Sequence, residues 1–251
     1  MPEAPDQPIR PAASVIIARD GDPEMEVFML RRTAGAAFAG GMYVFPGGRV
    51  ESHDHLENLD PWRTGPVDAQ AAQLRALGDE WRGYWIAAIR ETFEESGLLL
   101  AYDADGAMLD WKDEETEARF DALRHRIHDG DLDLIELCEQ ESLRLACDHV
   151  HFFNRWVTPP GRPRRFDTRF FIAEAPPGQT GLHDDKETVE SLWISPRRAL
   201  ELHAEGRFDL MRVTEHQLAT LQDLGSVAEL HRWALERDEF PVYRPELPPG
   251  A

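Results

Sequence analysis

The stretch RETFEESGL occupies residues 90–98 and follows the weakly polar run WIAAI at residues 85–89. At 3.6 residues per turn, Glu91, Glu94 and Glu95 stand at i, i+3 and i+4 and project from one face of a helix. The larger apolar side chains project from the opposite face: Ile86, Ile89 and Phe93. The pattern predicts an amphipathic helix with one side in the core and three carboxylates within a single turn on the other.

The end of this predicted helix is marked by Gly97. A helix commonly ends at a residue with a left-handed backbone, which glycine adopts most easily. The run from Leu98 to Tyr102 is almost wholly apolar, and it predicts a buried strand after the helix.

The three clustered carboxylates have two explanations. Like charges at these spacings repel by a few tenths of a kcal/mol per pair, and the negative end of the helix dipole adds to the cost. A hard divalent cation such as Mg²⁺ or Mn²⁺ reverses both penalties, because it prefers oxygen ligands. The alternative is an acidic face in water, the more common origin of this pattern in a chain with a net charge of −20.

An upstream segment favours the metal site. Residues 43–51, YVFPGGRVE, predict a strand that ends in a Pro-Gly-Gly turn, where backbone groups are free for a ligand. Gly48, five residues, Asp54 and then residues 90–98 together resemble the Nudix box, Gx5Ex7REUxEExGU. The chain departs from this motif in three places. Asp54 replaces a glutamate, 35 residues (55–89) replace the usual seven, and Thr92 replaces an aliphatic residue.

The resemblance extends over residues 12–202 and implies an α/β fold, the Nudix α/β/α sandwich with a mixed sheet. The split box, WVTPP at residues 156–160 and RFDTRFF at residues 165–171 resemble the branch that contains the peroxisomal coenzyme A diphosphatases and their bacterial relatives. Nudix enzymes use divalent metal to hydrolyse a nucleoside diphosphate linked to another group. The resemblance therefore implies a pyrophosphate-cleaving hydrolase.

The resemblance also implies roles for individual residues. The expected ligands of Mg²⁺ or Mn²⁺ are three carboxylates and a backbone carbonyl: Glu91, Glu94, Glu95 and Gly48. Arg90 is expected to orient one carboxylate through a charge-assisted hydrogen bond. The proton of the attacking water is expected to pass to Glu91 or to Glu187. Glu187 lies in an acidic loop before the predicted strand at residues 191–194, and Glu190 is the second candidate in that loop.

Two groups of arginines are candidates for binding substrate phosphates. Arg31 and Arg32 end the predicted strand at residues 26–32, beside the glycine-rich loop at residues 33–41, and one of them is expected to contact phosphate. Arg164 and Arg165 belong to a second group, on the turn after Pro159-Pro160-Gly161. Each group has an alternative role, since the arginines can instead pair with the acidic surface.

Composition limits the remaining functions. The net charge of −20 argues against nucleic-acid backbones and anionic membranes as partners. The two cysteines, Cys138 and Cys147, lack CxxC spacing and are expected to be packing residues in a reduced compartment. Because the sequence has no apolar run of about eighteen residues and no signal peptide, a cytoplasmic location is expected.

The predicted organisation is a single Nudix domain at residues 12–240. A disordered leader (1–11) precedes it and a proline-rich tail (241–251) follows. Helical insertions are expected at about residues 55–83 and 112–147, the second as a lid or a homodimer surface. A hairpin is expected from residues 13–18 and 26–32, and a helix from Ser195-Pro196.

The predicted substrate is coenzyme A or an acyl derivative, cut to 3′,5′-ADP and (acyl-)4′-phosphopantetheine. Its 3′-phosphate, in addition to the pyrophosphate, gives an acidic protein a reason to cluster arginines. NADH, ADP-ribose and nucleotide sugars share the pyrophosphate and remain alternatives. Another class is a Nudix-fold regulator that binds a nucleotide without cleaving it. A damaged glutamate cluster would indicate that class, and here all three glutamates are present.

Overall fold

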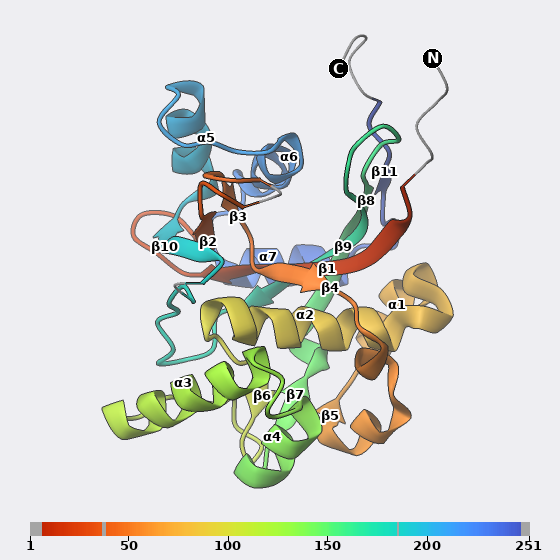
Figure 1. Ribbon diagram of the computed structural model, residues 1–251, viewed down its shortest axis with the longest axis vertical. Coiled ribbons are helices and arrows are strands. Elements are labelled where there is room, and N and C mark those ends of the chain that lie inside the picture. The colour runs from red at the N-terminus through yellow and green to blue at the C-terminus, as the bar shows by residue number, and fades with distance from the viewer. Residues whose placement is uncertain (1–6, 37–38, 185, 247–251) are drawn as a thin grey trace.

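The computed structural model describes residues 7–36, 39–184 and 186–246 (Figure 1). Within these residues eight strands form a central sheet: β1 (Ile9–Arg19), β2 (Glu26–Arg32), β3 (Tyr43–Val44), β4 (Gly47–Arg49), β8 (Val150–Val157), β9 (Arg165–Glu174), β10 (Thr188–Ile194) and β11 (Val242–Tyr243). The order is β10-β2-β1-β9-β8-β11, with β3 paired to β2 and β4 paired to β1. The sheet is mixed, because β1 runs parallel to β9 and β11 to β8, while the other pairs are antiparallel.

Helices cover both faces of this sheet. One face carries α1 (Ala71–Leu77), α2 (Trp81–Ser96), α3 (Glu114–His128), α4 (Leu134–Glu141) and a small sheet of β5 (Arg63–Thr64), β7 (Arg144–Ala146) and β6 (Ala101–Tyr102). The other face carries α5 (Pro196–Ala204), α6 (Arg212–Leu221) and α7 (Val227–Leu235). Short 3-10 helices occupy the connections: η1 (Ser52–His55), η2 (Glu57–Trp62), η3 (Asp68–Gln70), η4 (Gly78–Glu80) and η5 (Cys147–His149). The predicted α/β/α sandwich is confirmed.

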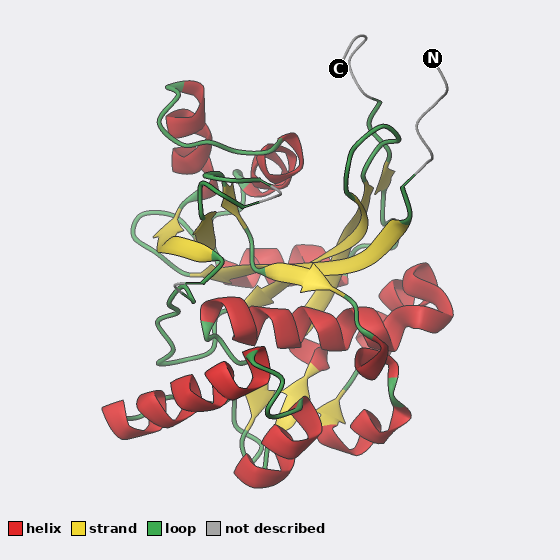
Figure 2. Cartoon of the chain, in the orientation of Figure 1, coloured by secondary structure: helices red, strands yellow, loops and turns green. Residues whose placement is uncertain are grey.

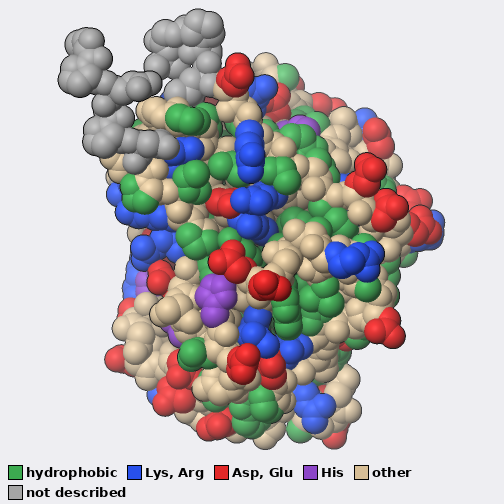
Figure 3. Space-filling model, turned by 90° about the vertical axis from the view of Figure 1, so that its right-hand side faces the viewer, with side chains coloured by type: hydrophobic (Ala, Val, Ile, Leu, Met, Phe, Trp, Pro, Cys, Tyr) green, Lys and Arg blue, Asp and Glu red, His purple; other side chains and the backbone are tan. Residues whose placement is uncertain are grey.

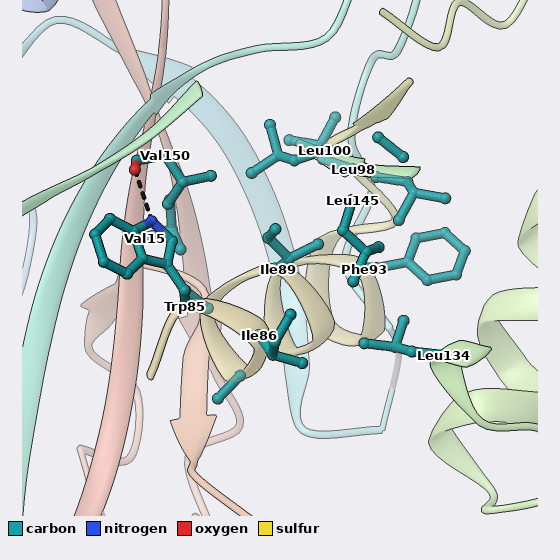
Figure 4. Close-up of a cluster of buried hydrophobic side chains, with 14 of the residues drawn as sticks. Val15, Trp85, Ile86, Ile89, Phe93, Leu98, Leu100, Leu134, Leu145 and Val150 are labelled. Carbon is teal, nitrogen blue, oxygen red and sulfur yellow. Dashed lines mark hydrogen bonds between the residues drawn. The ribbon is translucent and has the colours of Figure 1, made fainter. Parts of the chain in front are cut away.

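Alternation along the buried strands divides the core in two. Successive side chains of a strand point to opposite faces, so Val15 and Ile17 join the core under α2, whereas Ile16 and Ala18 join the core under α6 and α7. The first core surrounds the apolar face of α2, with Ile86, Ile89 and Phe93 fully buried (Figure 4). The apolar side of the predicted helix is therefore confirmed.

The segment that carries β3 and β4 separates β1 from β2. The hairpin pairing of β1 with β2 involves Ala18 and Val27 near the turn; farther along, β2 pairs with β3 and β1 pairs with β4. The carbonyl of Pro46 accepts hydrogen bonds from the Val15 N–H (2.9 Å) and the Ser14 hydroxyl (3.0 Å). The Pro-Gly-Gly turn is thus held between two strands and lies against the glutamate face of α2.

The first and last strands of the described chain extend beyond the predicted domain limits. Residues 9–11 of the expected leader belong to β1, because Ile9 pairs with Arg165 of β9, and residues 1–6 lie outside the described residues. Val242 and Tyr243 of the expected tail form β11, which pairs with β8. In both cases long-range strand pairing outweighs a proline-rich local composition.

The expected strand after α2 is shorter than predicted. Leu98, Leu99 and Leu100 are fully buried, but only Ala101–Tyr102 form a strand. The Leu99 N–H and carbonyl instead bond to the side-chain amide of Gln179, at 2.8 and 3.3 Å. A side chain from a distant loop replaces the neighbouring strand at this position.

The two insertions contain the expected helices (Figure 2). The first holds α1 and the 3-10 helices η2, η3 and η4, and the second holds α3 and α4. Helix α5 starts as predicted, with the Ser195 hydroxyl accepting from the Arg198 N–H and Pro196 in the first turn. Both cysteines are free and buried, as packing residues are. Among the helices of the described ranges, none has the length and apolar character needed to cross a membrane.

Candidate active site

Arg90 is the centre of the candidate site. Its Nε and Nη2 each donate at 2.9 Å to one carboxylate oxygen of Asp54, a bidentate pair in which both side chains are buried. Asp54 also accepts the Glu51 N–H at 2.8 Å. The 35-residue insertion is therefore looped out, and the two parts of the split box meet in space.

The remaining donors of Arg90 bind the glutamate face. Nη1 donates to the carboxylates of Glu91 (2.9 Å) and Glu94 (3.1 Å), and Nη2 donates to the Arg49 carbonyl (2.9 Å). Burial lowers the pKa of Arg90. The hydrogen bond to Asp54 and the charges of the three surrounding carboxylates together have a larger, opposite effect, so the pKa lies above its ordinary value. Arg90 is a permanent cation that orients two glutamates, one more than predicted.

The third glutamate contacts the glycine turn. Glu95 accepts a 2.9 Å hydrogen bond from the Gly47 N–H. Gly47 has φ +154°, and a Cβ there would overlap the Ala13 carbonyl and Ser14. At Gly48 a Cβ would occupy the place of the Glu91 carboxylate. The two glycines thus let the turn approach the glutamates closely.

The electrostatics of the glutamates suit a cation. Burial raises the pKa of Glu91 to about 7, with Arg90 lowering it and Glu94 raising it. Burial and the charge of Glu91 raise the pKa of Glu95 well above its usual value, despite the Gly47 hydrogen bond. Carboxylates held together with too little positive charge fit a hard divalent ion. In the described part of the chain, however, no three acidic, histidine or cysteine side chains lie close enough together to coordinate a metal ion as they stand. Arg90 instead forms hydrogen bonds with two of the glutamates.

The two arginines at the end of β2 have different surroundings, because neighbouring strand residues point to opposite faces. Arg32 lies on the glutamate side, with Nη2 at 2.9 Å from Glu187 and Nη1 at 4.0 Å from Glu95. Its Nε is buried without a hydrogen-bond partner among the described residues. Arg31 is more exposed and pairs with Glu190 at 3.5 Å. Of the two, only Arg32 is brought to the glutamates.

The two candidate proton acceptors lie beside different arginines. Glu187 lies next to Arg32, whereas Glu190 accepts from the Tyr43 hydroxyl at 3.0 Å and pairs with Arg31. The Glu187 loop is ordered by Asp184, whose carboxylate accepts the N–H groups of Glu187 (3.1 Å) and Thr188 (2.9 Å). Glu187, in the loop before β10, therefore lies nearer the glutamate face than Glu190, which belongs to β10.

The arginines of the β8–β9 turn are not brought to the glutamates. Arg165 is buried, and it donates to the carbonyls of Thr158 (3.2 Å) and Gln7 (3.4 Å); Arg164 is exposed. Arg165 pairs with Ile9 on one edge of β1, while Gly48 pairs with Ala13 on the other edge. Four residues along β1 correspond to about 13 Å.

Farther along the same two strands, charged side chains form a ladder. Asp167 of β9 accepts from Arg155 of β8 at 2.7 Å and pairs with Arg169 at 2.7 Å, and the Arg169 guanidinium lies 4.0 Å from the Tyr84 ring centroid. On the face drawn in Figure 3, basic side chains run in a broken column that acidic ones interrupt. Much of this positive charge is therefore matched by neighbours.

One residue near the site had no counterpart among the predicted site residues. Arg124 of α3 donates to the backbone carbonyls of Glu94 (2.9 Å) and Glu95 (3.0 Å). A usable signal was present, because Arg124 lies at helical spacing among the apolar residues of α3: Phe120, Leu123 and Ile127. An arginine in an apolar stripe needs buried partners.

Comparisons with known proteins agree with this geometry. A family model described as the NUDT19 Nudix domain matches residues 64–211. Acyl-coenzyme A diphosphatase NUDT19 of Gallus gallus is 28% identical over 91% of this chain and 72% of that protein; its Xenopus laevis counterpart is 24% identical over 91% and 68%. The crystal structure of a Nudix hydrolase from Alicyclobacillus acidocaldarius superposes with a TM-score of 0.70 and 25% identity, over 92% of this chain and 97% of that one. Because the family model covers more than half of the sequence, the chain belongs to the NUDT19 Nudix domain family.

Proposed function

We propose that this protein is a divalent-metal-dependent diphosphatase of coenzyme A and acyl-coenzyme A. Water cleaves a P–O bond of the pyrophosphate and leaves 3′,5′-ADP and (acyl-)4′-phosphopantetheine. The observation that carries the reaction type is the buried Arg90, which joins Asp54 to Glu91 and Glu94 beside the glycine turn. The substrate class rests on the relatives named acyl-coenzyme A diphosphatase, which align with 91% of the chain.

The proposed ligands of Mg²⁺ or Mn²⁺ are the carboxylates of Glu91, Glu94 and Glu95 and the carbonyl of Gly48. When bound, the ion neutralises pyrophosphate charge and makes water a better nucleophile. Arg90 Nη1 contacts one oxygen of Glu91 and one oxygen of Glu94, so it limits where the two carboxylates lie, while the second oxygen of each would face the ion. Glu91 or Glu187 accepts the proton of the attacking water.

We assign the phosphate contact at the end of β2 to Arg32 rather than Arg31. Arg32 already lies within 4.0 Å of Glu95 and has an Nε donor that no described residue engages. A substrate phosphate near the glutamates would take the place that Glu187 now occupies on Nη2 and release the Glu187 carboxylate. Binding of substrate and exposure of a candidate base are then linked. We assign no substrate contact to Arg164 and Arg165, because strand register places them far from Gly48 and Arg165 donates to backbone carbonyls.

A substrate panel tests the function. Purified protein is incubated with coenzyme A, acetyl-coenzyme A, 3′-dephospho-coenzyme A, NADH, ADP-ribose and a nucleotide sugar, with Mg²⁺, Mn²⁺ or EDTA, and products are identified by mass spectrometry. We expect 3′,5′-ADP from the first two substrates and loss of turnover in EDTA. Preferred cleavage of NADH, ADP-ribose or the sugar would reassign the substrate, and binding without turnover would indicate a regulator.

Partners and location follow from the same charge and cysteine arguments. We propose a small nucleotide-type substrate, with neither nucleic acid nor membrane as partner. The reason is that a net charge of −20 repels nucleic acid and anionic membrane surfaces. We propose a cytoplasmic location because both cysteines are free and buried. The α3–α4 insertion remains a candidate lid or homodimer surface; light scattering with and without coenzyme A distinguishes the two.

A further inference from the structure

The C-terminus of α2 is held by groups from outside the helix. The last four carbonyls of an α-helix have no partner within it. Here the Phe93 carbonyl accepts the Gly97 N–H (2.9 Å) and the Ser96 carbonyl accepts the Leu182 N–H (2.8 Å). The two carbonyls between them belong to Glu94 and Glu95, and Arg124 of α3 binds both.

The surroundings of Arg124 suit this contact. Only 2% of the residue is exposed, and its side chain is also 3.7 Å from Asp121. Gly97 has φ +72°, and a Cβ there would lie 3.2 Å from Arg124 Nη1, so glycine leaves room for the guanidinium. A buried cation at the negative end of a helix is electrostatically favourable, and the planar fork of arginine fixes two acceptors at once.

The same helix also reaches the loop that carries Glu187. Asp129, the residue that follows α3, pairs with Lys186 at 2.7 Å. This pair is exposed and contributes little stability, but it places the end of α3 against the residue next to Glu187. The insertion thus contacts both the helix of the three glutamates and the loop of the candidate base.

We propose that Arg124 is a positioning residue of the active site, which acts through the backbone carbonyls of Glu94 and Glu95. It fixes the backbone positions from which the two glutamate side chains extend. The α3 insertion thereby sets the metal affinity of a site to which it contributes no ligand. This role rests on the proposed function, in which these glutamates hold the cation. Mutation of a residue that holds metal-ligating residues in place commonly lowers metal affinity or activity by 10- to 100-fold.

The test compares Arg124→Ala and Arg124→Lys with two controls on the same helix. Arg119→Ala removes an exposed arginine that pairs with Glu141 of α4 instead. Phe120→Leu loosens the packing of α3 without touching the two carbonyls. For each variant, Mn²⁺ binding is measured by calorimetry without substrate, kcat and KM for acetyl-coenzyme A are measured with saturating Mn²⁺, and the melting temperature is recorded.

We expect Arg124→Ala to bind Mn²⁺ about 10- to 100-fold more weakly and to lose about tenfold in kcat, with KM changed less than about threefold. Arg124→Lys keeps a cation but not the fork, and should recover part of both losses; it also serves if Arg124→Ala does not fold. Unchanged Mn²⁺ affinity and kcat in a folded Arg124 variant would overturn the proposal. So would equal losses in Phe120→Leu. A wild-type protein that neither binds Mn²⁺ nor cleaves coenzyme A would instead reject the proposed function.

Discussion

The arginines at the end of β2 and those on the β8–β9 turn are equally prominent in the sequence, but they differ in what they contact. Arg32 lies between Glu187 and Glu95 and keeps a buried Nε without a hydrogen-bond partner in the described structure. Arg165 donates to backbone carbonyls of Thr158 and Gln7, and so ties the turn to the start of the chain. We therefore base the proposed phosphate site on nearness to the three glutamates rather than on the density of arginines along the sequence.

The contrast has an electrostatic origin. In a chain with a net charge of −20, an arginine finds an acidic or carbonyl partner almost anywhere, so most guanidiniums are committed to structure. An arginine that binds substrate must exchange its present partner for a phosphate. Arg32 can do so, because Glu187 is half exposed and can move into water, whereas Arg165 would leave backbone carbonyls without their donor.

The largest effect should come from the glutamates of α2, which lie beside the arginines at the end of β2. Glu94→Gln or Glu95→Gln removes a ligand charge next to the reacting phosphate and should lower kcat by at least about 100-fold. The fold should persist, because the acidic cluster repels itself when no metal is bound. Steady-state rates at saturating Mg²⁺, together with melting curves, check this. Near-wild-type turnover in both variants would place the chemistry elsewhere.

The next effect separates the two arginines of β2. Arg32→Ala should lower kcat/KM by about 10- to 100-fold, since a charge-assisted phosphate contact is worth about 1.5–3 kcal/mol. The loss should be equal for coenzyme A and 3′-dephospho-coenzyme A, because the pyrophosphate is common to both. Arg31→Ala is the matched control, with an expected change below about threefold. A larger loss in Arg31→Ala would reverse the assignment.

A smaller effect is expected from the two candidate proton acceptors at the start of β10. Glu187→Gln should lower kcat by about tenfold and leave Mn²⁺ affinity nearly unchanged, if Glu187 accepts a proton rather than holding metal. Glu190→Gln is the control, because Glu190 is occupied by Tyr43 and Arg31. Steady-state rates and Mn²⁺ titrations on both variants show which of the two carboxylates accepts the proton. A crippled Glu190→Gln beside a normal Glu187→Gln would move the role three residues along the chain.

The sequence predicted most of the fold because the signals were local. The apolar and acidic faces of α2, Gly97 as its end and the Ser195 cap each depend on spacing within one element. The sequence was less informative where contacts between distant segments determine the structure. Gln179 takes the place of a strand at Leu99, and Arg124 reaches α2 from 30 residues away. The placement of Arg32 rather than Arg31 toward the glutamates needed strand register, which composition does not reveal.

The smallest effect on catalysis should come from the β8–β9 turn. Arg164 is exposed on a turn whose strand register places it far from Gly48, so Arg164→Ala should change kcat/KM by less than about threefold on coenzyme A and on 3′-dephospho-coenzyme A. Arg165→Ala should lower the melting temperature instead, because it removes a buried side chain that donates to the carbonyls of Thr158 and Gln7. The decisive comparison is the ratio of kcat/KM for the two substrates in each variant. A loss of tenfold or more on coenzyme A alone would show that the 3′-phosphate reaches this turn, and the distinction between the two arginine regions would then fail.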